Sequence, residues 1–330
     1  MKELSIIIPT YDRNETLNSS VSNLISQATV ACEIIIIDNS SNQPVSETLG
    51  ELAEFVKIKK NPFNVGGNAN IMECIKESSG KFTWILGDDD LIKSDSIEKI
   101  LDAIKNFPEA AFINFSKNRT ATHICVGCSA LIKKIENFAD IHGIVHSVYK
   151  TEVIQSAIKF GYHYSYTTAP HIACLFASAS EDFQYVLLPS YLIEEVRQEN
   201  TAQWSLIDCA LGISSLVEID NYFSLRTRVL LAEKISKAII LESIVQQLVI
   251  YAIIDKKQAF FIYKQIVARR FPYSMSIFTR VKVLLYSFLI LHPKPGIKLI
   301  DVVYKKLKKF GYFKSHKTNQ NIIRDRKNRL

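Results

Sequence analysis

Three adjacent carboxylates, Asp88, Asp89 and Asp90, are the residues whose spacing most directly suggests chemistry. They follow the apolar run Phe82–Leu86, where a buried strand is expected to end. Because three negative charges in a row repel one another, their adjacency favours a bound cation. The alternative is a turn that ends the strand and caps a helix over Ser94–Ile104.

Two other polar clusters also come directly after apolar, β-branched runs. The three runs and the clusters that end them are Leu4–Ile8 with Pro9–Arg13, Glu33–Ile37 with Asp38–Ser41, and Phe82–Leu86 with Gly87–Asp90. Helical periods separate them, over Asn14–Gln27, Ser46–Phe55 and Ile71–Ser79. This alternation is typical of an α/β protein with a parallel sheet covered on both faces. Ligands of such sheets bind beyond the carboxyl ends of the strands, so the clusters are expected to form one site.

Four motifs in this region resemble family 2 glycosyltransferases in their order and spacing. They are Ser5-Ile-Ile-Ile-Pro-Thr-Tyr11, Glu33-Ile-Ile-Ile-Ile-Asp-Asn-Ser-Ser41, Asn61 with Asn64-Val-Gly-Gly67, and Trp84-Ile-Leu-Gly-Asp-Asp-Asp90. The resemblance covers roughly residues 3–118. It implies the GT-A nucleotide-sugar-binding fold, a mostly parallel sheet flanked by helices, and transfer of a sugar from a nucleotide-diphosphate sugar.

The resemblance assigns the first two clusters to the base of the nucleotide. Pro9 and Thr10 would shape a turn that presents the ring of Tyr11 to the base. Asp38 would accept a hydrogen bond from a base imide N–H, which favours a UDP- or dTDP-sugar. The alternatives are that Tyr11 packs on the sheet and that Asp38 caps the next helix.

The same resemblance assigns the glycine loop and the aspartates to the rest of the donor. Asn64, Gly66 and Gly67 would let the backbone approach the nucleotide closely, although the glycine pair alone is equally typical of a simple turn. Asp88 or Asp89 would bind the ribose hydroxyls. Asp90, together with Asp88, would ligate Mg²⁺ or Mn²⁺, and the ion would neutralise the leaving diphosphate.

The catalytic base is harder to place, because the family usually supplies an Asp or Glu just before a helix. Asp182 belongs to an acidic pair with Glu181, but the pair lies between a predicted helix and a predicted strand, where a turn is expected. His171 stands at the start of that helix after Pro170 and is the alternative base or metal ligand. The weaker candidates are His142, His146 and His163.

Later segments extend the predicted sheet and then become helical. Strands are expected at Ala110–Phe115, Ser129–Ile132, His142–Tyr149 and Phe183–Leu188, with a helix over His171–Ala179. From about Leu206 the pattern is helical and strongly apolar. We therefore predict a GT-A domain over residues 1–205 and a C-terminal helical extension over 206–330.

One further segment, Tyr191 to Trp204, is similar to the stretch that closes the transferase domain in bacterial O-antigen and capsule sugar transferases, including abequosyltransferase-like enzymes. Within it, Arg197 would approach the diphosphate or pair with Glu194 or Glu195.

The positive charge of the chain is concentrated at its C-terminal end. Residues 294–330 carry twelve Lys and Arg against Asp301 and Asp325, a net charge of +10, while the rest of the chain sums to −3. Apolar helices beside this charge favour contact with the inner face of the cell membrane. The alternative is a solvated helix that completes the core. The basic segment lacks the interleaved aromatic residues that are typical of nucleic-acid binding. The N-terminus shows no secretory signal, which favours a location in the cytoplasm.

Cysteines are the remaining candidates for chemistry. Cys125 and Cys128 form a CxxC motif that is compatible with zinc or redox chemistry. A second CxxC and a histidine pair at zinc-finger spacing are both missing from the sequence, and packing as small hydrophobes is the stronger alternative.

The sequence thus predicts a metal-dependent glycosyltransferase of bacterial surface polysaccharide synthesis. It would transfer a sugar from a UDP- or dTDP-sugar to a glycan or lipid-linked glycan acceptor, with inversion. Two rivals are a sugar-1-phosphate nucleotidyltransferase, which would want a Gly-rich basic loop after the first strand, and a non-catalytic subunit that keeps the donor fold.

Overall fold

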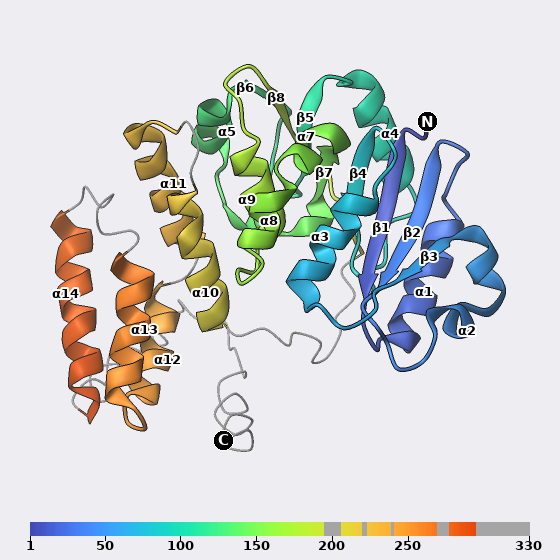
Figure 1. Cartoon of the computed structure of the whole chain (residues 1–330). Helices are drawn as coiled ribbons and strands as arrows, with labels where there is room; N and C mark the ends of the chain where they lie inside the picture. Colours follow the sequence, from blue (N-terminus) through green and yellow to red (C-terminus); the bar gives the residue numbers. More distant parts are fainter. Residues whose placement is uncertain (195–205, 220–222, 239–240, 269–276, 295–330) are drawn as a thin grey trace. The chain divides into compact units, whose positions relative to one another are not determined.

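The computed structural model describes residues 1–194, 206–219, 223–238, 241–268 and 277–294 (Figure 1). The chain divides into two compact units. The first comprises Met1–Ile240 with Ala268–Met275, and the second comprises Leu241–Val267 with Ser276–Leu330.

An eight-stranded sheet organises the first unit, in the order β3-β2-β1-β4-β7-β5-β8-β6. Its strands are β1 (Leu4–Thr10), β2 (Cys32–Asp38), β3 (Lys57–Lys60), β4 (Phe82–Ile85), β5 (Ala110–Phe115), β6 (His123–Val126), β7 (Ser147–Lys150) and β8 (Gln184–Leu188). Strands β1 to β4 are mutually parallel, β5 and β8 run in the same direction as β4, and β7 and β6 run against them. The sheet is therefore mixed and mostly parallel, as predicted.

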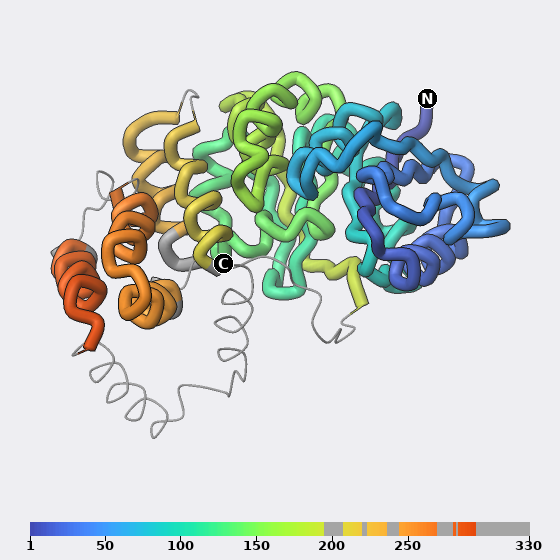
Figure 2. The backbone as a smooth tube through the Cα atoms, turned by 60° about the horizontal axis from the view of Figure 1, so that its bottom comes forward, coloured from blue at the N-terminus to red at the C-terminus, as the bar shows by residue number. Residues whose placement is uncertain are grey.

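Helices cover the sheet on both faces, as Figure 2 shows from a second direction. One face carries α1 (Asn14–Ile25), α2 (Val45–Leu49) with the 3-10 turn η1 (Gly50–Phe55), and α4 (Ser96–Asn106). The other carries α3 (Gly67–Glu77), α7 (Thr151–Ser156), α8 (Ile158–His163) and α9 (Pro170–Ala177).

Continuous apolar strands are required by this layering, because both faces of each central strand are buried. In β1, Ile6 and Ile8 pack in the core cluster that contains Leu17 and Val21 of α1. Ile7 points to the opposite face, because side chains alternate along a strand, and it is equally buried.

Two predictions in the middle of the chain were wrong. Residues Ser129–Ile132 do not form a strand but lie in α5 (Cys128–Lys134), after Gly127 with a left-handed φ of 88°. A short apolar run cannot be assigned to helix or strand by periodicity alone. Here a helix begins after the glycine, where the Glu181 carboxylate accepts the Ser129 N–H and hydroxyl. The predicted strand over His142–Tyr149 is extended only in β7. Before it come α6 (Ala139–His142) and the turn η2 (Ile144–His146).

The first helices after residue 205 pack on the sheet-containing part of the first unit. They are α10 (Leu206–Ser215), the turn η3 (Leu216–Glu218) and α11 (Leu225–Ala238). The Thr168 hydroxyl donates to the Cys209 sulfur at 3.4 Å, and the hydroxyls of Ser129 and Thr227 are 2.9 Å apart. A boundary at 205/206 stays a prediction, because residues 195–205 lie outside the described part of the chain, and the first unit continues to Ile240.

Three helices make up the described part of the second unit: α12 (Leu241–Tyr251), α13 (Lys256–Ala268) and α14 (Ile277–Leu291). The Tyr263 hydroxyl donates to the Val283 carbonyl at 2.9 Å and ties α13 to α14. Among the helices that are described, none has both the length and the apolarity needed to cross a bilayer.

Candidate functional site

The predicted polar clusters meet at one edge of the sheet. Strands β1, β2 and β4 are parallel, so their carboxyl ends lie at the same edge, and Thr10 pairs with Asp38 in the register of β1 and β2. The Asn39 amide donates to the Thr10 carbonyl at 2.9 Å, which joins the first two clusters. The Thr10 hydroxyl donates to the Asp88 carboxylate at 2.8 Å, which joins the first to the third.

The aspartate turn after β4 is held by partners from β1 and α1. Asp88 is 8% exposed, and Ser20 of α1 donates to its backbone carbonyl at 3.2 Å. The Arg13 guanidinium lies 2.6 Å from an Asp89 oxygen and 3.6 Å from Asp88. The Asp90 carboxylate accepts the Gly87 N–H at 3.1 Å. The turn is thus a fixed arrangement in which Arg13 balances part of the negative charge.

Burial leaves the negative charges of two of these carboxylates only partly balanced by nearby positive charge and hydrogen bonds. It raises the pKa of Asp88 to about 6, against the lowering effects of Thr10 and Arg13. Burial and the adjacent Asp89 charge likewise raise the pKa of Asp90 to about 6. A divalent cation would supply the missing positive charge, so the donor set fits Mg²⁺ or Mn²⁺ chemically.

Protein ligands alone would not complete such a site. Within the described residues, no group of three or more His, Cys, Asp or Glu side chains is arranged to hold a metal ion. Magnesium commonly binds through one or two carboxylates together with substrate phosphates, so this sparse set is compatible with an ion bound jointly with a diphosphate.

A network of asparagines holds the loop before α3. The Asn39 side chain donates to Asn64 at 2.8 Å and accepts from Asn61 at 3.1 Å and from the Val65 N–H at 2.9 Å. Asn70 accepts from Asn61 at 2.9 Å and donates to the Ile37 carbonyl of β2 at 3.1 Å. Sequence reasoning missed the positioning roles of Asn39 and Asn70. The signal that could have identified them is a polar residue type at a position that the fold is expected to bury.

The nucleotide-base residues are placed differently from one another. Tyr11 is 44% exposed, so its ring is available to a ligand rather than packed in the core. Asp38 is 1% exposed and accepts the Ser41 N–H at 2.8 Å, with the Lys60 ammonium 3.8 Å away. The structure thus gives Asp38 a turn-stabilising contact, and its recognition of a base imide stays a prediction.

The loop glycines permit the close approach that was predicted for them. Gly66 has a left-handed φ of 85°, and a Cβ at Gly66 or Gly67 would meet no atom within 4 Å, so open space lies beside this backbone. Asn64 accepts the Gly66 N–H at 2.8 Å and is itself exposed. Pro9, in β1, is half-buried and precedes the turn, as expected.

His171 lies at the start of α9 but is buried, with 2% exposure. Its Nε2 hydrogen-bonds the His142 carbonyl at 3.0 Å, and its buried Nδ1 has no hydrogen-bond partner. Burial lowers the pKa of His171 to about 3, so the ring is neutral. The ring of His142 is 6.3 Å away, and His163 ends α8 against Tyr164. The ring nitrogens of His142 and His171 hydrogen-bond to Thr168 and to the His142 carbonyl, not to the aspartate turn.

Asp182 lies at the opposite edge of the sheet from the aspartates. It precedes β8, which runs parallel to β5 and therefore in the same direction as β4. The carboxyl end of β8, not its amino end, thus lies at the edge of the sheet that carries the aspartates, which we call the donor edge. The neighbouring Glu181 accepts from the Ser129 hydroxyl at 2.7 Å and holds the start of α5. The structure therefore does not bring Asp182 together with the donor residues.

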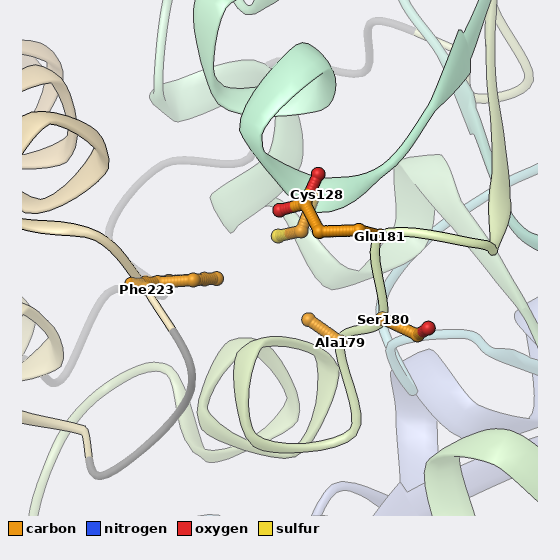
Figure 3. Close-up of a pocket in the computed structure, with 5 residues that line it drawn as sticks. All are labelled: Cys128, Ala179, Ser180, Glu181 and Phe223. Atoms are coloured by element: carbon orange, nitrogen blue, oxygen red, sulfur yellow. The ribbon is translucent and has the colours of Figure 1, made fainter.

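Glu181 and Cys128 instead line a separate cavity of about 300 Å³ in the first unit, with Ala179, Ser180 and Phe223 (Figure 3). Burial raises the pKa values of both Cys125 and Cys128 thiols, which keeps them protonated. A thiolate is the species that ligates metals or attacks disulfides, so the raised pKa values give the CxxC motif no support as a metal or redox site.

The segment after β8 continues along the aspartate turn. Ile92 and Ile193 form an antiparallel bridge, and the Glu194 N–H donates to the Leu91 carbonyl at 2.7 Å. Arg197 and Glu195, for which a diphosphate contact or a mutual ion pair was predicted, lie outside the described residues.

Comparison with known sequences places this site in a family. Residues 5–137 match the family described as "Glycosyl transferase family 2". The chain is similar to the poly(ribitol-phosphate) beta-N-acetylglucosaminyltransferase TarP of Staphylococcus aureus, with 32% identity over 110 residues, 30% of this chain and 32% of TarP. It is also similar to the abequosyltransferase RfbV of Salmonella typhimurium, with 28% identity over 100 residues, 28% of this chain and 30% of RfbV. The chain thus spans about a third of the length of each of these relatives.

Solved structures extend the likeness of the fold beyond that segment. Residues 1–349 of S. aureus TarS with UDP-GlcNAc superpose with a TM-score of 0.58 at 13% identity, covering 89% of this chain and 92% of that one. The Pyrobaculum calidifontis mannosyltransferase PcManGT, with GDP-Man and Mn²⁺, superposes with a TM-score of 0.53 at 12% identity, covering 89% and 87%. The sheet, the clusters at its carboxyl edge and the family match agree: residues 5–137 of this chain are a glycosyltransferase family 2 segment, and the chain has a GT-A fold.

Proposed function

We propose that this chain transfers a sugar from a UDP- or dTDP-sugar to a hydroxyl of a glycan or lipid-linked glycan acceptor in bacterial surface polysaccharide synthesis. The observation that carries the proposal is the aspartate turn at the carboxyl edge of the sheet. There Asp88 and Asp90 have raised pKa values, which favour a cation, and Thr10 and Arg13 hold the turn in place.

The donor would lie along the strand ends from β2 to β4. Tyr11, the Asp38 turn and the open backbone at Gly66 and Gly67 would surround the nucleoside, and Asp88 or Asp89 the ribose. Base recognition by Asp38 would require its carboxylate to face the ligand beside the Ser41 contact.

Asp90, with Asp88, would hold Mg²⁺ or Mn²⁺ jointly with the diphosphate. The ion when bound neutralises charge on the leaving nucleoside diphosphate. Arg13 keeps Asp89 in an ion pair, so the carboxylate that remains for the ion and diphosphate is principally that of Asp90.

The transfer reaction also needs a group that accepts the proton of the attacking hydroxyl. Direct displacement of the nucleoside diphosphate by that hydroxyl would invert the configuration at the anomeric carbon. His171 is our candidate among the described residues, because its Nδ1 carries no hydrogen bond. Burial lowers its pKa to about 3, so the ring as it stands is a weak base and would need a more polar surrounding to accept the proton. It is buried, so an acceptor hydroxyl would reach it only if the residues that cover α9 move aside.

A second candidate function is donor binding without catalysis. Burial of His171 and the placement of Asp182 at the opposite edge of the sheet favour it, because neither side chain is presented to the donor edge as the structure stands.

Donor hydrolysis and donor binding test both candidates together. Mn²⁺-dependent hydrolysis of a panel of UDP- and dTDP-sugars is expected in the unaltered chain. Asp90→Asn should lower it roughly hundredfold, since a metal interaction of several kcal/mol is removed. Asp102→Asn, at an exposed position of α4, is the matched control and should be unchanged. If the chain binds a donor but hydrolyses none of the donors in the panel, the result would support the non-catalytic function and contradict the enzymatic one.

Membrane association is a further part of the proposal. The second unit carries seventeen Lys and Arg against four Asp and Glu. Four apolar side chains of α14 at helical spacing are 46–70% exposed: Val281, Leu284, Leu285 and Phe288. An exposed apolar stripe on a basic unit suits the surface of an anionic bilayer, where a lipid-linked acceptor would be presented.

A further inference from the structure

Four segments far apart in the sequence meet around the ring of Tyr191. The ammonium of Lys93, after β4, lies 5.3 Å from the ring centroid, and that of Lys117, after β5, lies 5.1 Å from it. The ring of His146, just before β7, is 5.0 Å away. Tyr191 itself follows β8. We refer to Lys93, Lys117, His146 and Tyr191 as the Tyr191 cluster.

The cluster lies where β4, β7, β5 and β8 meet the aspartate edge of the sheet, on the side of the aspartate turn opposite to β1 and β2. Strands β2 and β1 carry the predicted nucleoside residues, β4 leads to Asp90, and β7, β5 and β8 follow in the order of the sheet. The Lys93 N–H donates to the Leu192 carbonyl at 2.9 Å, so the segment that follows Asp90 runs beside the segment that contains Tyr191. A donor that lies across β2 to β4 would therefore end its sugar next to the cluster, where the acceptor must enter.

Positive charge predominates at this position. Behind the two lysines, the Arg119 guanidinium donates to the backbone carbonyls of Asn114 at 2.9 Å and Leu188 at 3.4 Å. Lys117 and Arg119 both add to the effect of burial in lowering the pKa of His146, which only Asp140 opposes. Among the residues that the structure describes, the carboxylates nearby are Asp90, Asp140 and the exposed Glu194.

His146 adds a second, independent indication that a polar ligand belongs here. Its Nδ1 is buried and has no hydrogen-bond partner, whereas buried polar atoms are normally satisfied. The ring lies against Gly143, where a Cβ would come within 2.9 Å of its Cδ2 atom.

We propose that the Tyr191 cluster is a binding subsite for a phosphate group of the acceptor. The two lysines would bind the phosphate oxygens as point charges, and His146 would donate one hydrogen bond to the phosphate through a protonated Nδ1. The Tyr191 ring would pack on the carbons beside the phosphate. This inference rests on the proposed function, which requires an acceptor. It deepens that function, because it specifies that the acceptor is a phosphate-bearing glycan, polyol or lipid rather than a neutral glycan.

Calorimetric titration of the full chain saturated with UDP and Mn²⁺ tests the subsite without turnover. Glycerol 1-phosphate should bind, whereas glycerol should not. Lys93→Gln and Lys117→Gln should each weaken binding by about fivefold, as expected for one partly exposed charge pair. Lys105→Gln, an exposed lysine of α4, is the matched control and should bind as the unaltered chain does. A short isoprenyl phosphate in a parallel arm shows by its relative affinity whether a lipid phosphate or a polyol phosphate is the better source.

Two outcomes would overturn the subsite. One is equal glycerol 1-phosphate affinity in the unaltered chain and in the Lys93→Gln/Lys117→Gln double variant. The other is a loss of UDP affinity in that double variant matching the loss of glycerol 1-phosphate affinity, which would assign the lysines to the donor diphosphate. If the unaltered chain fails to bind UDP, the proposed function fails separately, and phosphate binding in the absence of UDP still decides the subsite.

Discussion

Asp88 and Asp90 link proton binding to metal binding at the scale of single residues. Both carboxylates are buried beside Asp89, and their pKa values rise from 3.8 to about 6. Protons and a divalent cation would therefore compete for the same oxygens, in a pH range in which ordinary carboxylates are already ionised.

The first prediction is a pH threshold for stabilisation by Mn²⁺. Between about pH 4 and 6 the folded metal-free chain holds protons that the unfolded chain has released. The contribution of this pair to the free energy of unfolding therefore falls as pH rises through 6. Mn²⁺ replaces the protons, so its stabilising effect should be present at pH 7.5 and disappear below pH 6, as measured by thermal unfolding with UDP present.

Asp90→Asn is the informative variant for this measurement, because it removes one of the two titrating groups. The pH threshold should weaken in Asp90→Asn and persist in Asp102→Asn. A stabilisation by Mn²⁺ that is equally large at pH 5 and pH 7.5 would contradict the assignment of the ion to these carboxylates.

At the scale of elements, the donor edge depends on a loop that has no regular structure of its own. The chain between β3 and α3 is fixed by side-chain hydrogen bonds, and Asn39 at the end of β2 accepts two of them and donates a third. Asn39 is 2% exposed, so each lost bond leaves a buried polar group without a partner.

The second prediction is that Asn39→Ala loosens the loop and weakens donor binding together. Loss of these contacts should lower the free energy of unfolding by about 2–3 kcal/mol. UDP affinity should fall as well, because the backbone at Gly66 and Gly67 loses its support. Urea unfolding and calorimetric titration with UDP measure the two effects. Asn106→Ala, at the exposed end of α4, should change neither, and unchanged UDP affinity in a destabilised Asn39→Ala would separate the loop from the nucleotide site.

How far the sequence predicts this molecule differs between its elements. Strands β1, β2 and β4 are buried on both faces, so their apolar runs identify them, and the parallel arrangement then places Thr10, Asp38 and Asp88 at one edge. The run at Ser129–Ile132 is too short for periodicity to separate helix from strand, and a turn residue decided it.

The positions of site residues that depend on the pairing of distant strands could not be predicted from local sequence patterns. Asp182 had the expected residue type, but its position follows from the direction of β8, which only the pairing with β5 reveals. The Tyr191 cluster likewise joins the ends of β4, β5 and β8 with the start of β7, and no spacing along the chain indicates that they are neighbours.

At the scale of the whole molecule, the transferase part extends beyond the sheet. A Cβ on Gly212 of α10 would meet the Thr167 backbone at 2.7 Å, so this helix lies directly on the segment before α9. The Lys234 ammonium of α11 donates to the Ile135 carbonyl after α5. We therefore expect residues 206–240 to be needed by the transferase part.

The third prediction concerns truncation. A chain ending at residue 240 should fold and bind UDP with the affinity of the full chain, because the buried core residues described for the first unit all lie before residue 240 and only its short segment Ala268–Met275 is removed. A chain ending at residue 205 should be markedly less stable, since it exposes the buried surface beneath α10 and α11. Thermal unfolding and UDP titration of both fragments make the measurement, and a stable, UDP-binding 1–205 fragment would restore the boundary predicted from the sequence.

The fourth prediction is that the second unit binds anionic membranes. Each Lys or Arg near an anionic bilayer contributes about 1 kcal/mol, and the exposed stripe on α14 adds apolar contact. The full chain should sediment with vesicles containing phosphatidylglycerol but not with purely phosphatidylcholine vesicles, and binding should fall as salt screens the charges. Leu284→Ser and Phe288→Ser should weaken binding without unfolding the chain, because both side chains are largely exposed, whereas the exposed Tyr162→Ser of the first unit should not. Salt-independent self-association that is abolished by the α14 variants would instead assign the stripe to a second copy of the chain.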